Sequence, residues 1–496
     1  MGILTKTDFI EYLKCAKNFW LKKRSPDLFV EEELSDYEKR LITQGGEVEK
    51  VARRVFPDGV LVEGSLKEKV EKTKKLIKQK KAPLYHAAFL TDEGLFVEVD
   101  ILDYDEAEGG WTIYEVKSST KIKEGWDSYH IRDVGFQKEV LQKTDLEISD
   151  LFIMHVNKNY VRCGDIDPVK LFTIEKVTAR VDDFNLETEI GRALELLNKE
   201  DVDISFCDCL YKTSRRKHCS SFEVLNSRVP ERSVHEISRI TQDKLESLIE
   251  EGVLDIKDVP DDFDLTPKQR DQVELARRDE PKINKAVIKR RLENLEYPLY
   301  FLDYETYSSA IPILDGFSPS DHLPFQVSIH VLKEKGDLSH HMYLAESLKT
   351  AESGLIKFMK EVVGPKGNLI SWYKSFENNR NKEMAERHPE EKEFLTDLNK
   401  RTFDLMKPFT KNYSHPDFNG SASLKKVLPV MVPELSYEGL VVQDGTDAME
   451  AWRKLIFKDL SDTEYEKTKE DLIKYSTLDT LSMVEIFDKL MNEVVD

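Results

Sequence analysis

Long apolar runs and cysteines are both scarce in this sequence of 496 residues. No apolar run approaches the roughly 20 residues that a membrane-spanning helix needs, so we expect no membrane partner. The first residues, MGILTKTDFIEYLKCAKNFW, lack the basic start and apolar core of a secretory signal, and we expect a cytoplasmic protein. Five cysteines exclude a disulfide framework, and three of them crowd into one short segment, which favours a metal or cluster site.

Two further absences narrow the function. The phosphate-loop pattern G-x-x-x-x-G-K-[ST] is missing, which excludes a recognisable ATP motor. Basic residues are outnumbered, with 74 Lys and Arg against 94 Asp and Glu and a net charge of −20. This balance argues against a protein that coats nucleic acid by bulk electrostatics. It remains compatible with an enzyme that has carboxylate-lined metal sites and local basic clusters.

The length predicts two large domains and a connector. Residues 1–220 are typical of a mixed α/β domain, with an antiparallel meander between 84 and 119 and a helix from about Ile131 to Lys143. Polar, charged helical segments fill residues 221–294. A new domain, 295–496, opens with the apolar strand YPLYFLDYET and alternates strands and helices. We therefore predict an α/β protein of two domains joined by a helical connector.

Carboxylates in the C-terminal domain indicate a metal site. Asp303 and Glu305 lie two apart on a predicted strand, so both project from one face. Such acids at the end of a buried strand are costly unless a cation neutralises them. Tyr475 and Asp479 share one face of a predicted helix, and Glu377 lies near a helix start. Four converging carboxylates predict two magnesium or manganese ions about 4 Å apart, an arrangement that hydrolyses phosphodiesters.

These motifs resemble those of the DEDD exonuclease superfamily, in its tyrosine-bearing subclass, across the whole C-terminal domain. The resemblance implies a DnaQ-like, RNase H-like fold, 3′→5′ exonuclease activity, and an attacking water oriented by Tyr475. The chain departs from the family at two positions, because Glu377 replaces the usual aspartate and Lys374 replaces a common asparagine. Asp404 is a competing candidate for the third acid. Lys425 is a candidate to approach a phosphate.

A second set of residues lies in the N-terminal domain. Asp100 falls on one predicted strand, and Glu115 and Lys117 share a face of the next. Two carboxylates and an ammonium can hold one or two divalent ions and stabilise the charge of the reacting phosphate. The pattern resembles PD-(D/E)XK nucleases, which implies a restriction-endonuclease-like fold. Gln137 corresponds to the motif glutamine of RecB-like nucleases, and Glu49 occupies the place of their early metal-binding histidine.

Four cysteines flank the N-terminal nuclease motifs: Cys15, Cys207, Cys209 and Cys219. One cysteine before the motifs and three after them resemble the iron–sulfur staple of AddB-type and CRISPR-associated RecB-like exonucleases. The resemblance implies a structural [4Fe–4S] cluster that clamps the ends of the domain together. Zinc is the alternative, because Cys-x-Cys is an unusual spacing for the staple and His218 is a spare ligand. Cys163 is expected to be a plain small residue.

The combined pattern resembles an uncharacterised bacterial family of two-domain proteins, with a RecB-like nuclease fused to a DEDD-type exonuclease. We expect a metal-dependent exodeoxyribonuclease that hydrolyses DNA, single-stranded and from an end, in repair, CRISPR-related processing or phage defence. An RNA exonuclease is one alternative, because nothing in the sequence decides the sugar. A catalytically degenerate nucleic-acid-binding module is another, motivated by the departures at Glu49, Lys374 and Glu377. Protein partners are not indicated.

Overall fold

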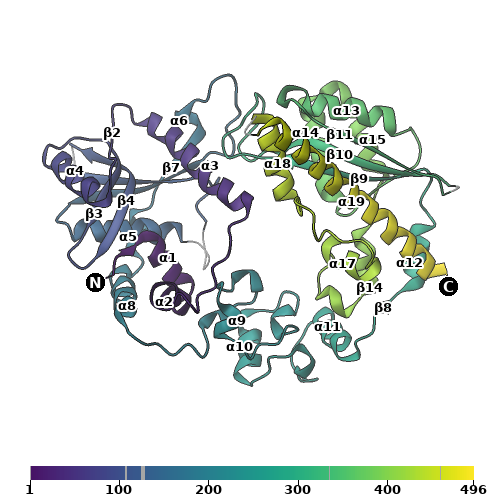
Figure 1. Ribbon diagram of the computed structural model, residues 1–496, viewed down its shortest axis with the longest axis horizontal. Helices are drawn as coiled ribbons and strands as arrows, with labels where there is room; N and C mark the ends of the chain where they lie inside the picture. The colour runs from purple at the N-terminus through teal and green to yellow at the C-terminus, as the bar shows by residue number, and fades with distance from the viewer. Residues whose placement is uncertain (1, 107–108, 124–128, 335, 458–459, 496) are drawn as a thin grey trace. The chain divides into compact units, whose positions relative to one another are not determined.

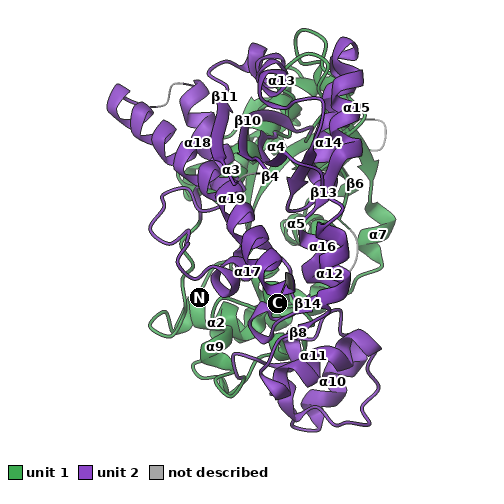
Figure 2. Ribbon diagram, turned by 90° about the vertical axis from the view of Figure 1, so that its right-hand side faces the viewer, with its two compact units in different colours: residues 1–34, 38–229, 309–320 green, residues 35–37, 230–308, 321–496 purple. Residues whose placement is uncertain are grey.

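The computed structural model describes residues 2–106, 109–123, 129–334, 336–457 and 460–495, and it has a mixed α/β architecture with more than one sheet (Figure 1). The chain divides into two compact units (Figure 2). The first comprises residues 1–34, 38–229 and 309–320, and the second comprises 35–37, 230–308 and 321–496. The predicted α/β class is confirmed. Residues 230–294 of the segment predicted as a connector belong to the second unit.

A mixed sheet forms the centre of the first unit. Its strands pair in the order β2-β3-β4-β5-β6-β7, and β1 pairs with β4 in parallel. The predicted meander is confirmed as the antiparallel strands β3, β4 and β5. The strands of this sheet are β1 (Leu4–Thr5), β2 (Val60–Leu61), β3 (Leu84–Leu90), β4 (Leu95–Asp105), β5 (Gly110–Lys117), β6 (Ile148–Val156) and β7 (Phe172–Lys176).

Helices of the first unit cover this sheet with apolar faces. The predicted helix after the meander is confirmed as α5, whose Phe136 is fully buried against Phe9 of α1, with ring centroids 5.2 Å apart. A reciprocal capping box between Thr5 and Asp8 fixes the start of α1 directly after β1. The helices are α1 (Lys6–Lys14), α2 (Ala16–Arg24), α3 (Asp36–Ala52, except its first two residues), α4 (Leu66–Lys78), α5 (His130–Gln142), α6 (Pro168–Leu171), α7 (Thr178–Asp182), α8 (Leu186–Asn198) and α9 (Phe222–Leu225).

The second unit is built on a sheet whose strands pair in the order β11-β10-β9-β12-β13. β9 lies in the middle, antiparallel to β10 and parallel to β12. Its near-continuous burial is typical of a strand covered on both faces. The strands are β9 (Leu299–Tyr307), β10 (Leu323–Leu332), β11 (Leu338–Leu344), β12 (Asn368–Ser371) and β13 (Thr402–Asp404), and a separate pair joins β8 (Lys282–Ile283) to β14 (Tyr413–Ser414).

The two faces of β9 pack against different helices. Tyr300 and Leu302 belong to a core with α13, α14 and α15, whereas Phe301 belongs to a core with the final helix, α19, and contacts Phe487 at 5.5 Å between ring centroids. The odd-numbered side chains of β9 therefore face α19. The helices of this unit are α10 (Gln242–Glu250), α11 (Pro267–Arg278), α12 (Lys285–Leu292), α13 (Ala351–Val362), α14 (Lys374–Arg387), α15 (Lys392–Arg401), α16 (Met406–Lys411), α17 (Leu424–Met431), α18 (Gly445–Phe457) and α19 (Asp462–Val495).

Candidate functional site

Three carboxylates meet between β9 and α19. Asp303, Glu305 and Asp479 each offer an oxygen, and these oxygens all lie within 4.8 Å of one another. We call these residues the acidic trio. Asp303 and Glu305 are odd-numbered residues of β9, so they project from the face that packs on α19. The sequence-based expectation that these three acids lie together therefore agrees with their arrangement.

Polar contacts between α19 and β10, the strand next to β9, hold α19 against the sheet. Gln326 and Ser328 of β10 are the strand partners of Glu305 and Asp303. The Gln326 amide donates to the Ser476 hydroxyl of α19 over 2.7 Å. Because this donor and its acceptor are both buried, losing the contact would leave unsatisfied polar groups in the core. The bond therefore favours one position of α19 along the strand, and with it one position of Asp479.

Ionisation of the trio is unfavourable in the protein without a metal ion. Burial raises the pKa of Asp303 and of Glu305 well above the usual range. The charge of Glu305 raises the pKa of Asp303 further, and the charge of Asp479 raises the pKa of both. Burial also raises the pKa of Asp479, to about 6. Among the described residues, no member of the trio forms an ion pair with a basic side chain. Clustered oxygen ligands with uncompensated charge fit a hard divalent cation.

Glu377 and Asp404 form a second, adjoining pair of acids. Glu377, near the start of α14, lies outside the group of three, although its charge raises the pKa of Asp303 and Glu305. Burial, and after it the charge of Asp404, raises the pKa of Glu377 to about 8. One carboxylate oxygen of each is buried without a hydrogen-bond partner. Orphaned buried oxygens of this kind suit a bound cation or an ordered water.

Two tyrosines face Asp479. Tyr475, predicted from its spacing, is buried one helical turn before Asp479 on α19. Tyr437 was not predicted, yet its hydroxyl donates a hydrogen bond to Oδ1 of Asp479. The ammonium of Lys425 lies 5.9 Å from the centroid of the Tyr437 ring. Lys425 stands 4.0 Å from Asp444, and its charge lowers the pKa of Asp479 against the effect of burial.

The residues predicted in the first unit gather at the edge of β4, β5 and α5. Glu115 accepts hydrogen bonds from Lys117 over 2.7 Å and from the Gln137 amide over 2.6 Å. Two further residues, which sequence reasoning missed, complete the cluster. Lys6 lies 2.9 Å from Glu115 and 3.2 Å from Asp133, and Asp133 also pairs with Lys117 over 2.5 Å. We call these five residues the lysine cluster.

Opposite charges inside the lysine cluster hold it in an ionised state. Burial favours the neutral form of Glu115, but the charges of Lys117 and then Lys6 outweigh it and hold the pKa of Glu115 below its usual range. The pKa of Lys117 is raised, because Asp133 and Glu115 outweigh the effect of burial. Both oxygens of Glu115 are engaged by protein donors. A cation that binds Oε1 of Glu115 would therefore compete with the two lysines.

Asp100 lies beside this cluster and differs from it. Its Oδ2 accepts from the backbone N–H of Val116 over 2.8 Å. Burial, and after it the charge of Glu115, raises the pKa of Asp100 to about 7. Asp100 and Glu115 do not belong to any group of three close ligand atoms in the described part of the chain. The pair is thus a less complete cation site than the trio.

Glu49 is engaged by other side chains. Its carboxylate accepts from Arg53 of the next helical turn and lies 2.7 Å from Nε2 of His86. Burial would raise the pKa of Glu49, but these two partners lower it. The charge of Glu49 still contributes to the raised pKa of Asp100, so the two carboxylates are neighbours. The structure therefore places Glu49 near the predicted site without aligning it as a third ligand.

Four cysteines converge at the end of the first unit. Cys15, Cys207, Cys209 and Cys219 have sulfur atoms within 4.8 Å of one another, and the first three are buried. Cys15 caps α2, which places it beside the loop that carries the other three. Four convergent thiols are a tetrahedral ligand set for a metal. The sequence-based grouping of these cysteines is confirmed as a potential metal site, and the geometry does not identify the metal.

Cys163 and His218 are not members of this four-ligand group. Cys163 is an exposed free thiol. The His218 ring stacks on Phe222, with centroids 3.7 Å apart, and His218 is not a member of the four-ligand group.

Throughout the described part of the chain, every helix is too short or too polar to traverse a lipid bilayer.

Comparison with known proteins gives a partial likeness. Residues 300–423 match a family described as a domain of unknown function, DUF2779. This segment contains Asp303, Glu305, Glu377 and Asp404 and ends before α19. The chain is also similar to "Uncharacterized protein MG366" of Mycoplasma genitalium, with 26% identity over 205 residues that cover 38% of this chain and 31% of that protein. The chain thus spans about a third of the length of that relative.

Proposed function

We propose that this protein is a divalent-metal-dependent nuclease that hydrolyses phosphodiester bonds of DNA, single-stranded and from the 3′ end. The observation that carries the proposal is the acidic trio, one half-buried and two buried acids that bring three carboxylate oxygens within 4.8 Å of one another. Hard oxygen ligands and unneutralised charge are what Mg²⁺ and Mn²⁺ require. A bound divalent cation would lower the pKa of water and offset charge on the phosphate. Asp303, Glu305 and Asp479 would hold it, and Glu377 would support a second one.

The chain's own residues would divide the remaining work. The Tyr475 hydroxyl, next to Asp479, would orient the water that attacks phosphorus. Tyr437 would hold Asp479 by its hydrogen bond, and Lys425 would contact a phosphate oxygen from the rim of the site. The central placement of β9 and its packing against α19 support the DEDD-type, RNase H-like assignment. These residues together supply positioning and electrostatic stabilisation, which phosphoryl-transfer catalysis depends on.

We propose a second nuclease site of the RecB-like PD-(D/E)XK type in the first unit. Lys6 and Lys117 present two ammonium groups to Glu115 and Asp133, and such groups can stabilise charge on a phosphate. Asp100, with its raised pKa, would hold a cation after one lysine releases Glu115. The four cysteines would hold a [4Fe–4S] cluster, with Zn²⁺ as the alternative, and join α2 to the end of the unit.

A nuclease assay with matched variants tests this proposal. Labelled single-stranded and double-stranded DNA and RNA are incubated with Mg²⁺ or Mn²⁺ and wild type, Asp303→Asn, Lys117→Met or the double variant. We expect hydrolysis by the wild type and a distinct loss in each single variant, because each removes one site. Equal inactivity of the wild type and double variant on every substrate would leave a nucleic-acid-binding module as the better reading. Preferential cleavage of RNA would change the proposed substrate from DNA to RNA and leave the proposed mechanism unchanged.

A further inference from the structure

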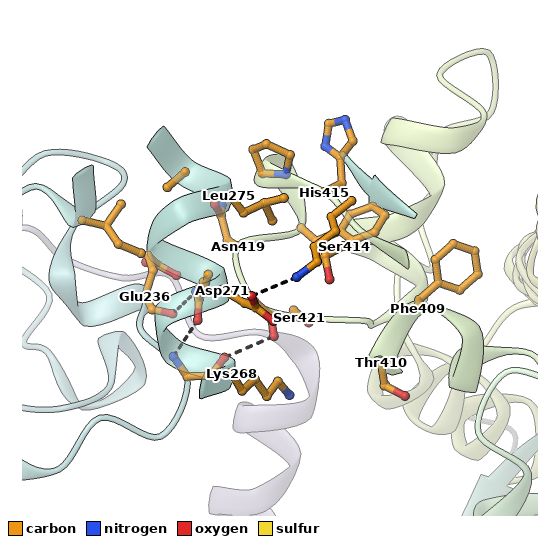
Figure 3. Close-up of a pocket in the computed structure, with 18 of the residues that line it drawn as sticks. Glu236, Lys268, Asp271, Leu275, Phe409, Thr410, Ser414, His415, Asn419 and Ser421 are labelled. Carbon is orange, nitrogen blue, oxygen red and sulfur yellow. Dashed lines mark hydrogen bonds and ion pairs between the residues drawn. The ribbon is translucent and has the colours of Figure 1, made fainter. Parts of the chain in front are cut away.

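A pocket with a volume of about 370 Å³ lies in the second unit, away from the acidic residues named above. One wall is α11, which contributes Lys268, Asp271 and Leu275 (Figure 3). The facing wall comes from the end of α16 and the segment that follows it, including Phe409 and His415. Volumes of this size are typical of pockets that hold small organic groups. The pocket is thus large enough for a nucleotide unit.

Basic side chains outnumber acidic ones in the lining of the pocket. Five of its lining residues are basic or histidine and two are acidic, although the chain as a whole carries a net charge of −20. Basic side chains that are not already paired with acids can attract an anionic ligand. The basic and histidine residues are Arg232, Lys268, Lys282, Lys411 and His415.

Two of these cations are available for a ligand. Arg232 already pairs with Asp279 over 2.8 Å and with Asp417, and Lys282 pairs with Asp271 over 2.9 Å. Lys268 and Lys411 are exposed and have no ion pair within the described ranges. A phosphate group between α11 and α16 would meet both ammonium groups without first breaking an ion pair.

Aromatic rings lie at the base of the same pocket. Phe409 and Phe418 are almost fully buried, with ring centroids 6.1 Å apart. The half-buried His415 ring lies 5.5 Å from the Phe418 ring. Rings beside cations are the combination that binds single-stranded nucleic acid, because bases stack on rings and ammonium groups contact phosphates. The two phenylalanines support the His415 ring, which is the ring in this group that is accessible to a base.

A short segment joins this pocket to the acidic trio. Ser421 lines the pocket, and the next carbonyl, of Ala422, accepts from the Trp372 indole N–H over 3.0 Å. α17 follows directly and carries Lys425, whose charge acts on Glu305 and Asp479. Residues 414–425 thus connect the pocket wall to the rim of the trio. A strand whose end lies at the trio could follow this segment from Lys425 at one end to His415 at the other.

We propose that this pocket binds a nucleotide unit of a single-stranded nucleic acid whose end lies at the acidic trio. Lys268 and Lys411 contact its phosphate, and His415 contacts its base. This inference rests on the proposed nuclease function, because it assigns the pocket to the same substrate strand. It adds a second anchoring point for the substrate, so that strands long enough to reach the pocket bind more tightly than shorter ones.

A binding experiment tests the pocket separately from catalysis. The full chain carrying Asp303→Asn is titrated in EDTA against a fluorescently labelled 20-nucleotide single-stranded DNA, and anisotropy gives Kd. The pocket variant adds Lys268→Glu and Lys411→Glu. The control variant adds Lys333→Glu and Lys366→Glu, two exposed lysines of the same unit with the same charge change. Circular dichroism of both variants checks that they fold equally.

We expect the pocket variant to bind about tenfold more weakly than the control, because two charge-assisted phosphate contacts are lost. The slope of log K against log salt should fall by about 1.4 for two contacts on a single strand. Equal binding by the pocket and control variants would show that the pocket does not bind the strand, even if the wild type cleaves DNA. If the wild type cleaves no nucleic acid but binding still depends on the pocket, the proposed binding role of the pocket stands and only the nuclease proposal is rejected.

Discussion

The hydroxyl of Tyr437 donates a hydrogen bond to Oδ1 of Asp479, a residue 42 positions later in the chain. This contact orients one carboxylate of the acidic trio from outside it. We predict that Tyr437→Phe weakens Mn²⁺ binding or activity about 10- to 100-fold, as the loss of a ligand's supporting partner does. The measurement is the Mn²⁺ concentration dependence of hydrolysis. The exposed Tyr297→Phe is the matched control. Unchanged Mn²⁺ dependence in Tyr437→Phe would show that Asp479 needs no such support.

The metal-free protein should lose stability as the acidic residues ionise. The folded-state pKa is about 6 for Asp479 and about 8 for Glu377, both above the usual carboxyl value. The unfolded chain releases these protons first, so the free energy of unfolding falls as the pH rises from about 4 through these values. We predict that Mg²⁺ raises the melting temperature more at pH 8 than at pH 5.5.

Asp303→Asn serves as the internal comparison for that experiment. Removing one charge from the trio should make the metal-free variant more stable than the wild type at pH 8, by about 1–3 kcal/mol. It should also remove most of the Mg²⁺ effect. A Mg²⁺ effect of equal size at both pH values, or one that survives in Asp303→Asn, would place the bound ion elsewhere.

The four clustered cysteines should bind a metal, and Cys163 should take no part in binding it. We predict that Cys209→Ser loses the bound metal and lowers the melting temperature, whereas Cys163→Ser changes neither, because Cys163 is exposed and apart from the group. Elemental analysis and absorbance near about 400 nm identify an iron–sulfur cluster, and zinc gives no colour. A wild-type preparation from anaerobic purification that contains neither iron nor zinc would contradict a cluster role for these thiols.

Lys6 should matter as much as Lys117 at the N-terminal site. Both ammonium groups contact Glu115 and Asp133, so each is placed to stabilise phosphate charge. In the Asp303→Asn background, we predict that Lys6→Met and Lys117→Met each reduce the remaining hydrolysis by about 100-fold. The control is Lys138→Met. Lys138 lies on the same helix as Gln137, and its substitution removes an ion pair with Asp182. Full activity in Lys6→Met would restrict Lys6 to a structural ion pair.

Local patterns predicted part of the two sites. Strand alternation identified Asp303 and Glu305, helical spacing identified Tyr475 and Asp479, and clustering along the chain identified Cys207, Cys209 and Cys219, because each of these signals is periodic or local. Cys15 is far from the other three in the sequence, and it was assigned to them by the resemblance to the iron–sulfur staple. Lys6 carried no such signal, since it reaches Glu115 only through the pairing of β1 with β4. Tyr437 follows α17 in an irregular segment, so its contact with α19 depends on tertiary packing.

Asp133 differs from these two, because a signal for it existed. It lies four residues before Gln137, on the same face of α5, and both side chains face Glu115 and Lys117. An acid one helical turn before a motif glutamine was therefore available as a candidate. The pairing of Glu377 with Asp404 depended instead on the parallel register of β12 and β13, which no local pattern reveals.

The most direct test of the central claim is the hydrolysis of a 5′-labelled single-stranded 20-mer in Mn²⁺ by wild type and by Asp303→Asn, resolved by length. The wild type should give a series of products shortened stepwise from the 3′ end. In Asp303→Asn these stepwise products should form at least about 1000-fold more slowly, because a metal ligand at the reacting phosphate is lost. Stepwise shortening at the wild-type rate in Asp303→Asn, or its absence from the wild type in every divalent metal, would contradict a DNA exonuclease centred on the acidic trio.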